Sequence, residues 1–143
     1  MDFKNKTPEE IIRELILQNR GTHNFLQMRD MMDLAKAARI EVPKNIKKPE
    51  LYDLLLTVYT PRELAETGGV GLLNYHFREK LGLSTREVGQ MAKDGLIQET
   101  GREQIRVYGR LRHPPLYSVF DYCRLTPEDV ERWRKAQIRK KGA

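Results

Sequence analysis

The same helix-starting pattern occurs three times in the chain, as Thr7-Pro8-Glu9-Glu10, Thr60-Pro61-Arg62-Glu63 and Thr126-Pro127-Glu128-Asp129. A threonine hydroxyl can accept a hydrogen bond from a free amide of the first turn, and proline at the first helical position loses no hydrogen bond. Acidic residues favour the positive end of the helix dipole. The pattern therefore predicts three helix N-termini. The copies do not recur at a fixed period, so they indicate shared capping and not a repeat array.

Apolar periodicity extends this prediction to most of the chain. Helices are expected at about 8–17, 25–38, 49–58, 61–66, 71–80, from residue 84 onward, and 127–140. After Gly95, runs of β-branched and aromatic residues at 96–97, 104–108 and 116–122 predict strands, separated by 100–102 and 110–115. The expected fold class is mainly α with a small β-hairpin sheet.

The positive charge is concentrated in the second half of the chain. Residues 1–60 carry 10 Lys and Arg against 9 Asp and Glu, a net charge of +1, whereas residues 61–143 carry 16 against 11, a net charge of +5. Such a field attracts polyanions. There is no apolar run of membrane-spanning length and no secretory leader pattern, so we expect a cytoplasmic protein without membrane attachment.

Residues 81–97, LGLSTREVGQMAKDGLI, have the pattern of two helices joined by a tight turn. Gly82 is expected to reverse the chain, while Leu81, Leu83, Val88 and Met91 lock the two helices together. Ser84 and Glu87 have the spacing of a capping box. Arg86, Gln90 and Lys93 follow at i, i+4 and i+7, which places them on one exposed stripe of the second helix.

Over roughly residues 70–125 the chain resembles the helix-turn-helix of winged-helix and MerR/excisionase-type regulators. The resemblance implies that the second helix enters the major groove of DNA and that the following hairpin, the wing, contacts the backbone or minor groove. It implies base readout by Arg86 and Gln90, since arginine suits guanine and glutamine suits adenine. The expected phosphate contacts are Thr85, Lys93, Arg102, Arg106, Arg110 and Arg112. Arg78 departs from the family pattern, which has a small residue four positions before the turn glycine.

A second resemblance covers Met28 to Leu55, which is similar to the SAP and Rho-termination-factor N-terminal families of helix-extended-helix units. The residues that match the core are Leu34, Ala38, Ile40, Ile46, Leu51, Leu54 and Leu55. Lys48 matches the lysine that these families place at a helix N-terminus. With Lys44 and Lys47 it predicts a phosphate site at that N-terminus. Related units also bind proteins, so both kinds of partner remain open for this module.

Together these patterns predict a SAP-like helical module at residues 1–59 and a winged helix-turn-helix with a basic C-terminal helix at residues 60–143. The expected function is non-enzymatic binding of double-stranded DNA, as a bacterial or phage transcription regulator or a replication or packaging accessory factor. DNA or RNA preference stays open. The alternative is a protein-interaction adaptor or inhibitor that docks on a larger, host machine.

No catalytic constellation, metal site or cofactor motif is expected. His23, His76 and His113 have no acid or cysteine at ligand spacing, and Gly68-Gly69-Val70-Gly71 lacks the residues of a P-loop. The last helix carries only Val130, Trp133, Ala136 and Ile138 as apolar residues, which can pack on the domain or on a second copy. A homodimer is therefore a further expectation.

Overall fold

The computed structural model describes residues 3–18, 26–103 and 105–142. Eight helices and four short strands lie within these residues. The helices are α1 (Pro8–Leu17), α2 (Met28–Ala37), α3 (Lys48–Leu55), α4 (Pro61–Gly68), α5 (Asn74–Leu81), α6 (Thr85–Lys93), α7 (Val119–Arg124) and α8 (Pro127–Gly142). The strands are β1 (Glu99–Arg102), β2 (Ile105–Val107), β3 (Arg110–Arg112) and β4 (Pro115–Tyr117). The mainly helical fold class with a small hairpin region is confirmed. His23 and the expected start of the second helix at residue 25 lie outside the described residues.

All three Thr-Pro helix starts are confirmed. Thr7 and Thr60 each form a complete capping box, with Glu10 and Glu63 respectively. At α8 the Thr126 hydroxyl accepts from the amide of Asp129, and the Asp129 carboxylate accepts from the amide of Thr126 at 2.8 Å. Local capping chemistry therefore sets these helix boundaries.

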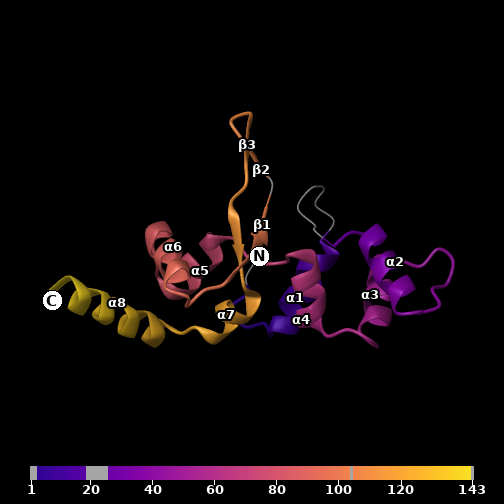
Figure 1. The fold of residues 1–143 in the computed structure, drawn as a ribbon, viewed down its shortest axis with the longest axis horizontal. Helices are drawn as coiled ribbons and strands as arrows, with labels where there is room; N and C mark the ends of the chain where they lie inside the picture. Colours follow the sequence, from indigo (N-terminus) through magenta and orange to yellow (C-terminus); the bar gives the residue numbers. More distant parts are fainter. Residues whose placement is uncertain (1–2, 19–25, 104, 143) are drawn as a thin grey trace.

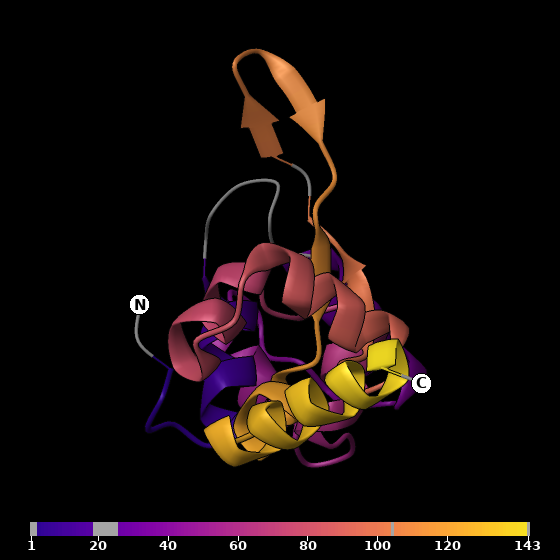
Figure 2. The same ribbon diagram turned by 90° about the vertical axis from the view of Figure 1, so that its left-hand side faces the viewer.

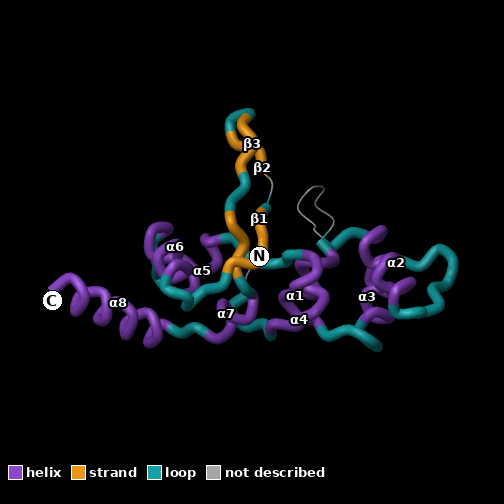
Figure 3. The backbone as a smooth tube through the Cα atoms, in the orientation of Figure 1, coloured by secondary structure: helices purple, strands orange, loops and turns teal. Residues whose placement is uncertain are grey.

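The molecule is elongated, with a narrow hairpin projecting from its middle. Figure 1 shows α2 and α3 at one end and α8 at the other. The strands all belong to the projecting ribbon (Figure 3), and its tip stands clear of every helix in the perpendicular view (Figure 2). Within the described residues, no helix is long and apolar enough to cross a membrane.

The N-terminal helix packs with the second half of the chain. α1 contacts α4 and α7, while α2 and α3 pack mainly against each other. Phe3 is buried, and its ring lies 5.2 Å from the ring of His76 in α5. Buried side chains from Phe3 to Val130 form one hydrophobic cluster. The expected division at residues 59 and 60 stays a prediction, but α1 makes contacts on both sides of it.

The hairpin is one antiparallel ribbon with an irregular middle. β1 pairs with β4 and β2 pairs with β3, and the amide of Glu103 donates to the carbonyl of Pro114 between the two pairs. Leu72, in the connection between α4 and α5, exchanges two backbone hydrogen bonds of 2.8 Å with Tyr117. The base of the ribbon is therefore fixed to the helices by backbone pairing.

Four details of the sequence-based prediction are wrong. Residues 100–102, expected to separate two strands, belong to β1, because Gly101 and Arg102 pair with Leu116 and Pro115 of β4. Residues 119–122 are not strand but the start of α7, because buried Val119 and Tyr122 have helical spacing and the Ser118 hydroxyl caps the helix by accepting from the amide of Asp121. Residues 110–112, expected as a connection, form β3, because the chain reverses at Tyr108 and Gly109 instead. Their φ angles of 51° and 76° suit a two-residue hairpin turn. Residues 96–97 precede β1 and belong to no strand.

Glycines allow the α4–α5 connection to lie directly on β1. A Cβ added at Gly101 would stand 2.7 Å from the carbonyl oxygen of Gly69, and one added at Gly71 would stand 2.2 Å from the Thr100 hydroxyl. Both distances are shorter than any ordinary carbon contact, so side chains at these positions would push the ribbon away from the helices. Only glycine fits this backbone-to-backbone approach.

We predict that Gly101→Ala destabilises the protein by about 1–3 kcal/mol, the range for overpacking a close contact. Urea unfolding followed by circular dichroism measures this. Gly89→Ala is the matched control, because a Cβ at Gly89 in α6 would meet nothing within 4 Å. The control should be unchanged or more stable by up to about 1 kcal/mol. Equal destabilisation by both variants would contradict the steric explanation.

Candidate nucleic-acid interface

α5 and α6 are joined by the predicted turn at Gly82. Gly82 ends α5 in the left-handed conformation, at φ 67°, and its amide donates to the Arg78 carbonyl at 2.9 Å. The expected locking residues Leu81, Leu83, Val88 and Met91 are all buried. The turn depends on the Arg78 carbonyl and not on its side chain, which is why this departure from the family pattern does not prevent it. The Arg78 Nε is buried without a hydrogen-bond partner among the described residues, an unfavourable feature at this position.

The start of α6 is fixed by the predicted capping box. The Ser84 hydroxyl accepts from the amide of Glu87 at 3.1 Å, and the Glu87 carboxylate accepts from the amide of Ser84 at 3.0 Å. Because the first turn is held in this way, the side chains that follow Ser84 have defined directions relative to the domain.

The outer face of α6 consists of Thr85, Arg86, Gly89 and Lys93. Thr85, Arg86 and Lys93 are exposed, and within the described residues neither cation has an ion-pair or hydrogen-bond partner. Gln90 lies at the edge of this face, and its amide donates to the Asp94 carboxylate at 3.1 Å. The structure therefore brings the four sequence-predicted residues of α6 together, with two free positive charges between them.

Gly89 lies at the centre of the outer face of α6, and neither its backbone conformation nor its packing requires a glycine there. It has ordinary helical geometry, and a Cβ there would meet open space. Glycine inside a helix costs about 1 kcal/mol relative to alanine. The missing side chain exposes helix backbone between Arg86 and Lys93, so a partner could approach this face closely.

Helix α8 supports the opposite edge of α6, which sequence analysis did not predict. Arg134 makes a bidentate ion pair with Glu87, at 2.8 and 3.1 Å, and also donates to the carbonyl of Gly82 at 2.9 Å. Arg134 therefore joins α8 to both the turn and the capping box. Its hydrogen bonds, together with those from Ser84, lower the pKa of Glu87 to about 2 against the desolvation that would raise it.

A second set of contacts from α8 holds the carboxylate at the end of α6. The indole N–H of Trp133 donates to the Asp94 carboxylate at 2.8 Å, and the amide of Gln137 donates to it at 3.1 Å. These hydrogen bonds and the one from Gln90 lower the pKa of Asp94. The only acid at the C-terminal end of α6 is thus held against α8. No local sequence signal connects residues this far apart, so only the three-dimensional structure finds these contacts.

The hairpin carries cations on both of its faces. Paired residues of an antiparallel ribbon share a face, and neighbours along a strand alternate. Val107 pairs with Arg110, so these two share one face of the ribbon. Arg106 pairs with Leu111, and these two share the opposite face. We call Arg106, Arg110 and Arg112 the hairpin arginines. All three are exposed, and no partner for their side chains lies in the described part of the chain.

Arg102 differs from the hairpin arginines. It forms an ion pair with Glu99 at 3.2 Å and donates to the carbonyl of His113 at 3.0 Å. It therefore braces the base of the ribbon, and contacting a phosphate would compete with these interactions. The expected phosphate contact at Arg102 remains a prediction.

α6 and the hairpin lie on the same side of the molecule. Figures 1 and 2 both place α6 at the level of the base of the ribbon, with α8 on the side away from the hairpin tip. The lysines of the α2–α3 unit do not join them, because that unit lies at the other end of the molecule (Figure 1). Lys44 and Lys47 are exposed, whereas Lys48 is half-buried, and burial lowers its pKa while Asp30 opposes the shift.

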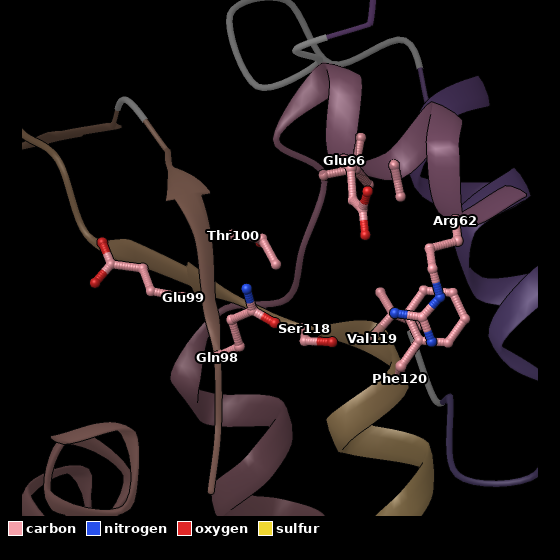
Figure 4. A pocket seen from close by; sticks show the side chains of 10 residues that line it. Arg62, Glu66, Gln98, Glu99, Thr100, Ser118, Val119 and Phe120 are labelled. Atoms are coloured by element: carbon pink, nitrogen blue, oxygen red, sulfur yellow. The ribbon is translucent and has the colours of Figure 1, made fainter. Parts of the chain in front are cut away.

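A small pocket between α4 and the base of the ribbon was not predicted from the sequence. Figure 4 shows its lining side chains, among them Arg62, whose guanidinium lies 3.7 Å from the centre of the Phe120 ring. Its volume of ≈ 160 Å³ is below the roughly 300 Å³ at which small-molecule sites begin.

A larger groove of ≈ 460 Å³ lies between α6 and α8, lined by residues that include Arg86, Gln90 and Ile138.

The described residues contain no group of three or more His, Cys, Asp or Glu side chains placed to hold a metal ion. His76 is buried, which lowers its pKa to about 4, so it stays neutral at physiological pH.

No protein-family model, curated protein or solved structure matches this chain.

We predict that Glu87→Gln lowers stability by about 1 kcal/mol at pH 7, because it weakens the cap and the ion pair with Arg134. The folded-state pKa of Glu87 is depressed from 4.5 to about 2. Its contribution is therefore complete above pH 4.5 and is lost as the pH falls towards 2. Thermal melts of wild type and variant should converge over that interval.

The matched control is Glu41→Gln, which removes the same charge at an exposed position. It should melt with the wild type throughout. A difference between Glu87→Gln and wild type that stays constant from pH 7 to pH 2 would contradict the assigned role of the carboxylate.

Proposed function

We propose that residues 60–143 form a winged helix-turn-helix domain that binds double-stranded DNA. The element order supports this proposal: the α5–α6 pair is followed at once by an antiparallel ribbon that projects beyond the helices. This is the arrangement that the resemblance to winged-helix regulators implies. No described element covers the outer face of α6.

One observation carries the proposal most directly. Five cations are exposed without partners in the described chain, namely Arg86 and Lys93 on α6 and the three hairpin arginines. The two elements that carry them, α6 and the hairpin, lie on the same side of the molecule (Figures 1 and 2). Unpaired surface cations on two neighbouring elements repel one another, and a polyanion that spans both elements relieves this repulsion. The backbone of a DNA duplex is a polyanion of that reach.

The residues differ in their proposed roles. Arg86 lies in the first turn of α6 and is the candidate for bidentate recognition of guanine. Lys93 and the hairpin arginines contact phosphates, which position the protein. The Gln90 amide is hydrogen-bonded to Asp94 in the free protein. Gln90 therefore reads adenine only if it breaks this hydrogen bond and forms new ones with the base.

We also propose that the α2–α3 pair has a SAP-like fold, because the residues expected to form its core are buried or half-buried. Leu51 and Leu55 of the expected core are fully buried, and Leu34, Ile40 and Ile46 are half-buried against the same cluster. The hydroxyl of Tyr59 donates to the Leu34 carbonyl at 3.2 Å and closes the unit. We propose that this unit binds a second partner, nucleic acid or protein, at a distance from the α6 surface.

The adaptor function remains the second candidate because of one feature. Ile138 is 70% exposed beside the groove between α6 and α8. A protein partner that covers this isoleucine would favour docking on a larger machine over DNA readout. Loss of partner binding on replacement of Arg86 would favour DNA readout, whereas loss on replacement of Ile138 would favour docking on a protein.

We predict that Arg86→Ala weakens binding to a selected duplex by roughly 10-fold to 100-fold, the cost of one bidentate base contact, and broadens its sequence preference. Fluorescence anisotropy with a random duplex library and single-stranded controls, across about 50–200 mM salt, measures both effects. Lys135→Ala is the control, since Lys135 is exposed on α8 and the same charge is lost. Failure of the wild type to bind duplex at the lowest salt would overturn the proposal.

We also predict opposite effects of Gly89→Ala on stability and on binding. The added methyl should raise the thermal midpoint, because alanine favours the helix, and should lower duplex affinity by preventing close approach of the α6 backbone. A graded series of Gly89→Ala, Gly89→Val and Gly89→Leu should lose affinity in order of size. Unchanged affinity across the series would exclude contact at the centre of α6.

A further inference from the structure

The tip of the hairpin contains a residue that the protein itself does not explain. Tyr108 is 100% exposed, and its backbone is left-handed at φ 51°. A bulky residue with positive φ is unfavourable, and asparagine is preferred at this position of a two-residue turn. Tyr108 therefore adds local strain and buries no surface. A role towards a partner accounts for both features.

The neighbours of Tyr108 continue this unusual exposure. Val107 is 40% exposed and Leu111 is 44% exposed, on opposite faces of the ribbon. Two apolar side chains and an aromatic ring at the end of a free-standing ribbon make a narrow apolar tip. All three side chains are therefore accessible to a partner.

The charges around the tip indicate the chemistry of its partner. Arg106 lies on one face, and Arg110 and Arg112 lie on the other, so the ribbon is positive on both sides. A flat protein surface would pair with one face only and leave the other charged face in solvent. A groove with an anionic wall on each side pairs with both, and the minor groove of duplex DNA has this form.

We infer that the hairpin tip is a wedge, in which Tyr108 enters the minor groove and stacks against a base pair while the hairpin arginines contact the two flanking phosphate strands. This inference rests on the proposed binding of duplex DNA. Apolar side chains that insert at a base step unstack it partly and bend the duplex. Stacking of an aromatic ring on a base supplies the favourable contact.

The experiment uses the full chain and a duplex selected from the random library, with 2-aminopurine replacing each adenine in turn. Unstacking of a base raises 2-aminopurine fluorescence, and fluorescence resonance energy transfer between end labels reports bending. Binding of wild type should raise the fluorescence at one step and shorten the end-to-end distance. Tyr108→Asn should abolish both signals and reduce affinity by about fivefold to one-hundredfold.

Two comparisons make the result decisive. Tyr108→Phe keeps the ring and should behave as wild type, and Tyr108→Asn should melt at or above the wild-type temperature because asparagine relieves the strained turn. If Tyr108→Asn binds and bends as wild type while Arg86→Ala loses affinity, the wedge is wrong and the proposed function stands. If wild type binds no duplex, both are overturned.

Discussion

The close backbone approach between the α4–α5 connection and the base of the hairpin holds the two halves of the candidate interface together. Gly69 and Gly71 lie against β1, where Gly101 leaves room for the Gly69 carbonyl, and Leu72 pairs with Tyr117. Because α5 begins directly after this connection, the same contact sets where the α5–α6 pair starts and where the ribbon emerges. Hydrogen bonds between backbones are directional, so they fix orientation better than apolar packing alone. The position of the hairpin relative to α6 follows from this contact.

A second constraint acts through Arg134. It connects α8 with the Glu87 carboxylate and the Gly82 carbonyl, so one guanidinium stabilises both the turn and the start of α6. Trp133 and Gln137 hold Asp94 at the other end of the helix. The acids of α6 are thereby paired on the α8 side, and its cations remain free on the outer face. Glu87 and Asp94 are therefore engaged by α8, whereas Arg86 and Lys93 have no partner among the described residues.

Features set by neighbouring residues could be predicted from the sequence, whereas those set by distant residues could not. The threonine caps, the Ser84–Glu87 box and the Gly82 turn each involve residues within a few positions, and all were predicted. At Val119–Tyr122, aromatic and β-branched residues favoured a strand, but burial at helical spacing and the Ser118 cap made a helix. Residues 110–115 were expected to connect two strands, yet the chain reverses at Tyr108 and Gly109. The contacts of Arg134 and Trp133 join separate elements, so periodicity and motif spacing contain no signal for them.

The packing of α1 has a consequence for the order in which the protein can fold. α1 is synthesised before α4 and α7, the two helices that cover its apolar face. Phe3 likewise gains its ring contact only after His76 has been made. Until α7 leaves the ribosome, Ile11, Ile12 and Ile16 lack part of the surface that buries them. The α5–α6 pair can form from local contacts while the chain is growing, but α1 can complete its packing only after the chain has been made as far as α7.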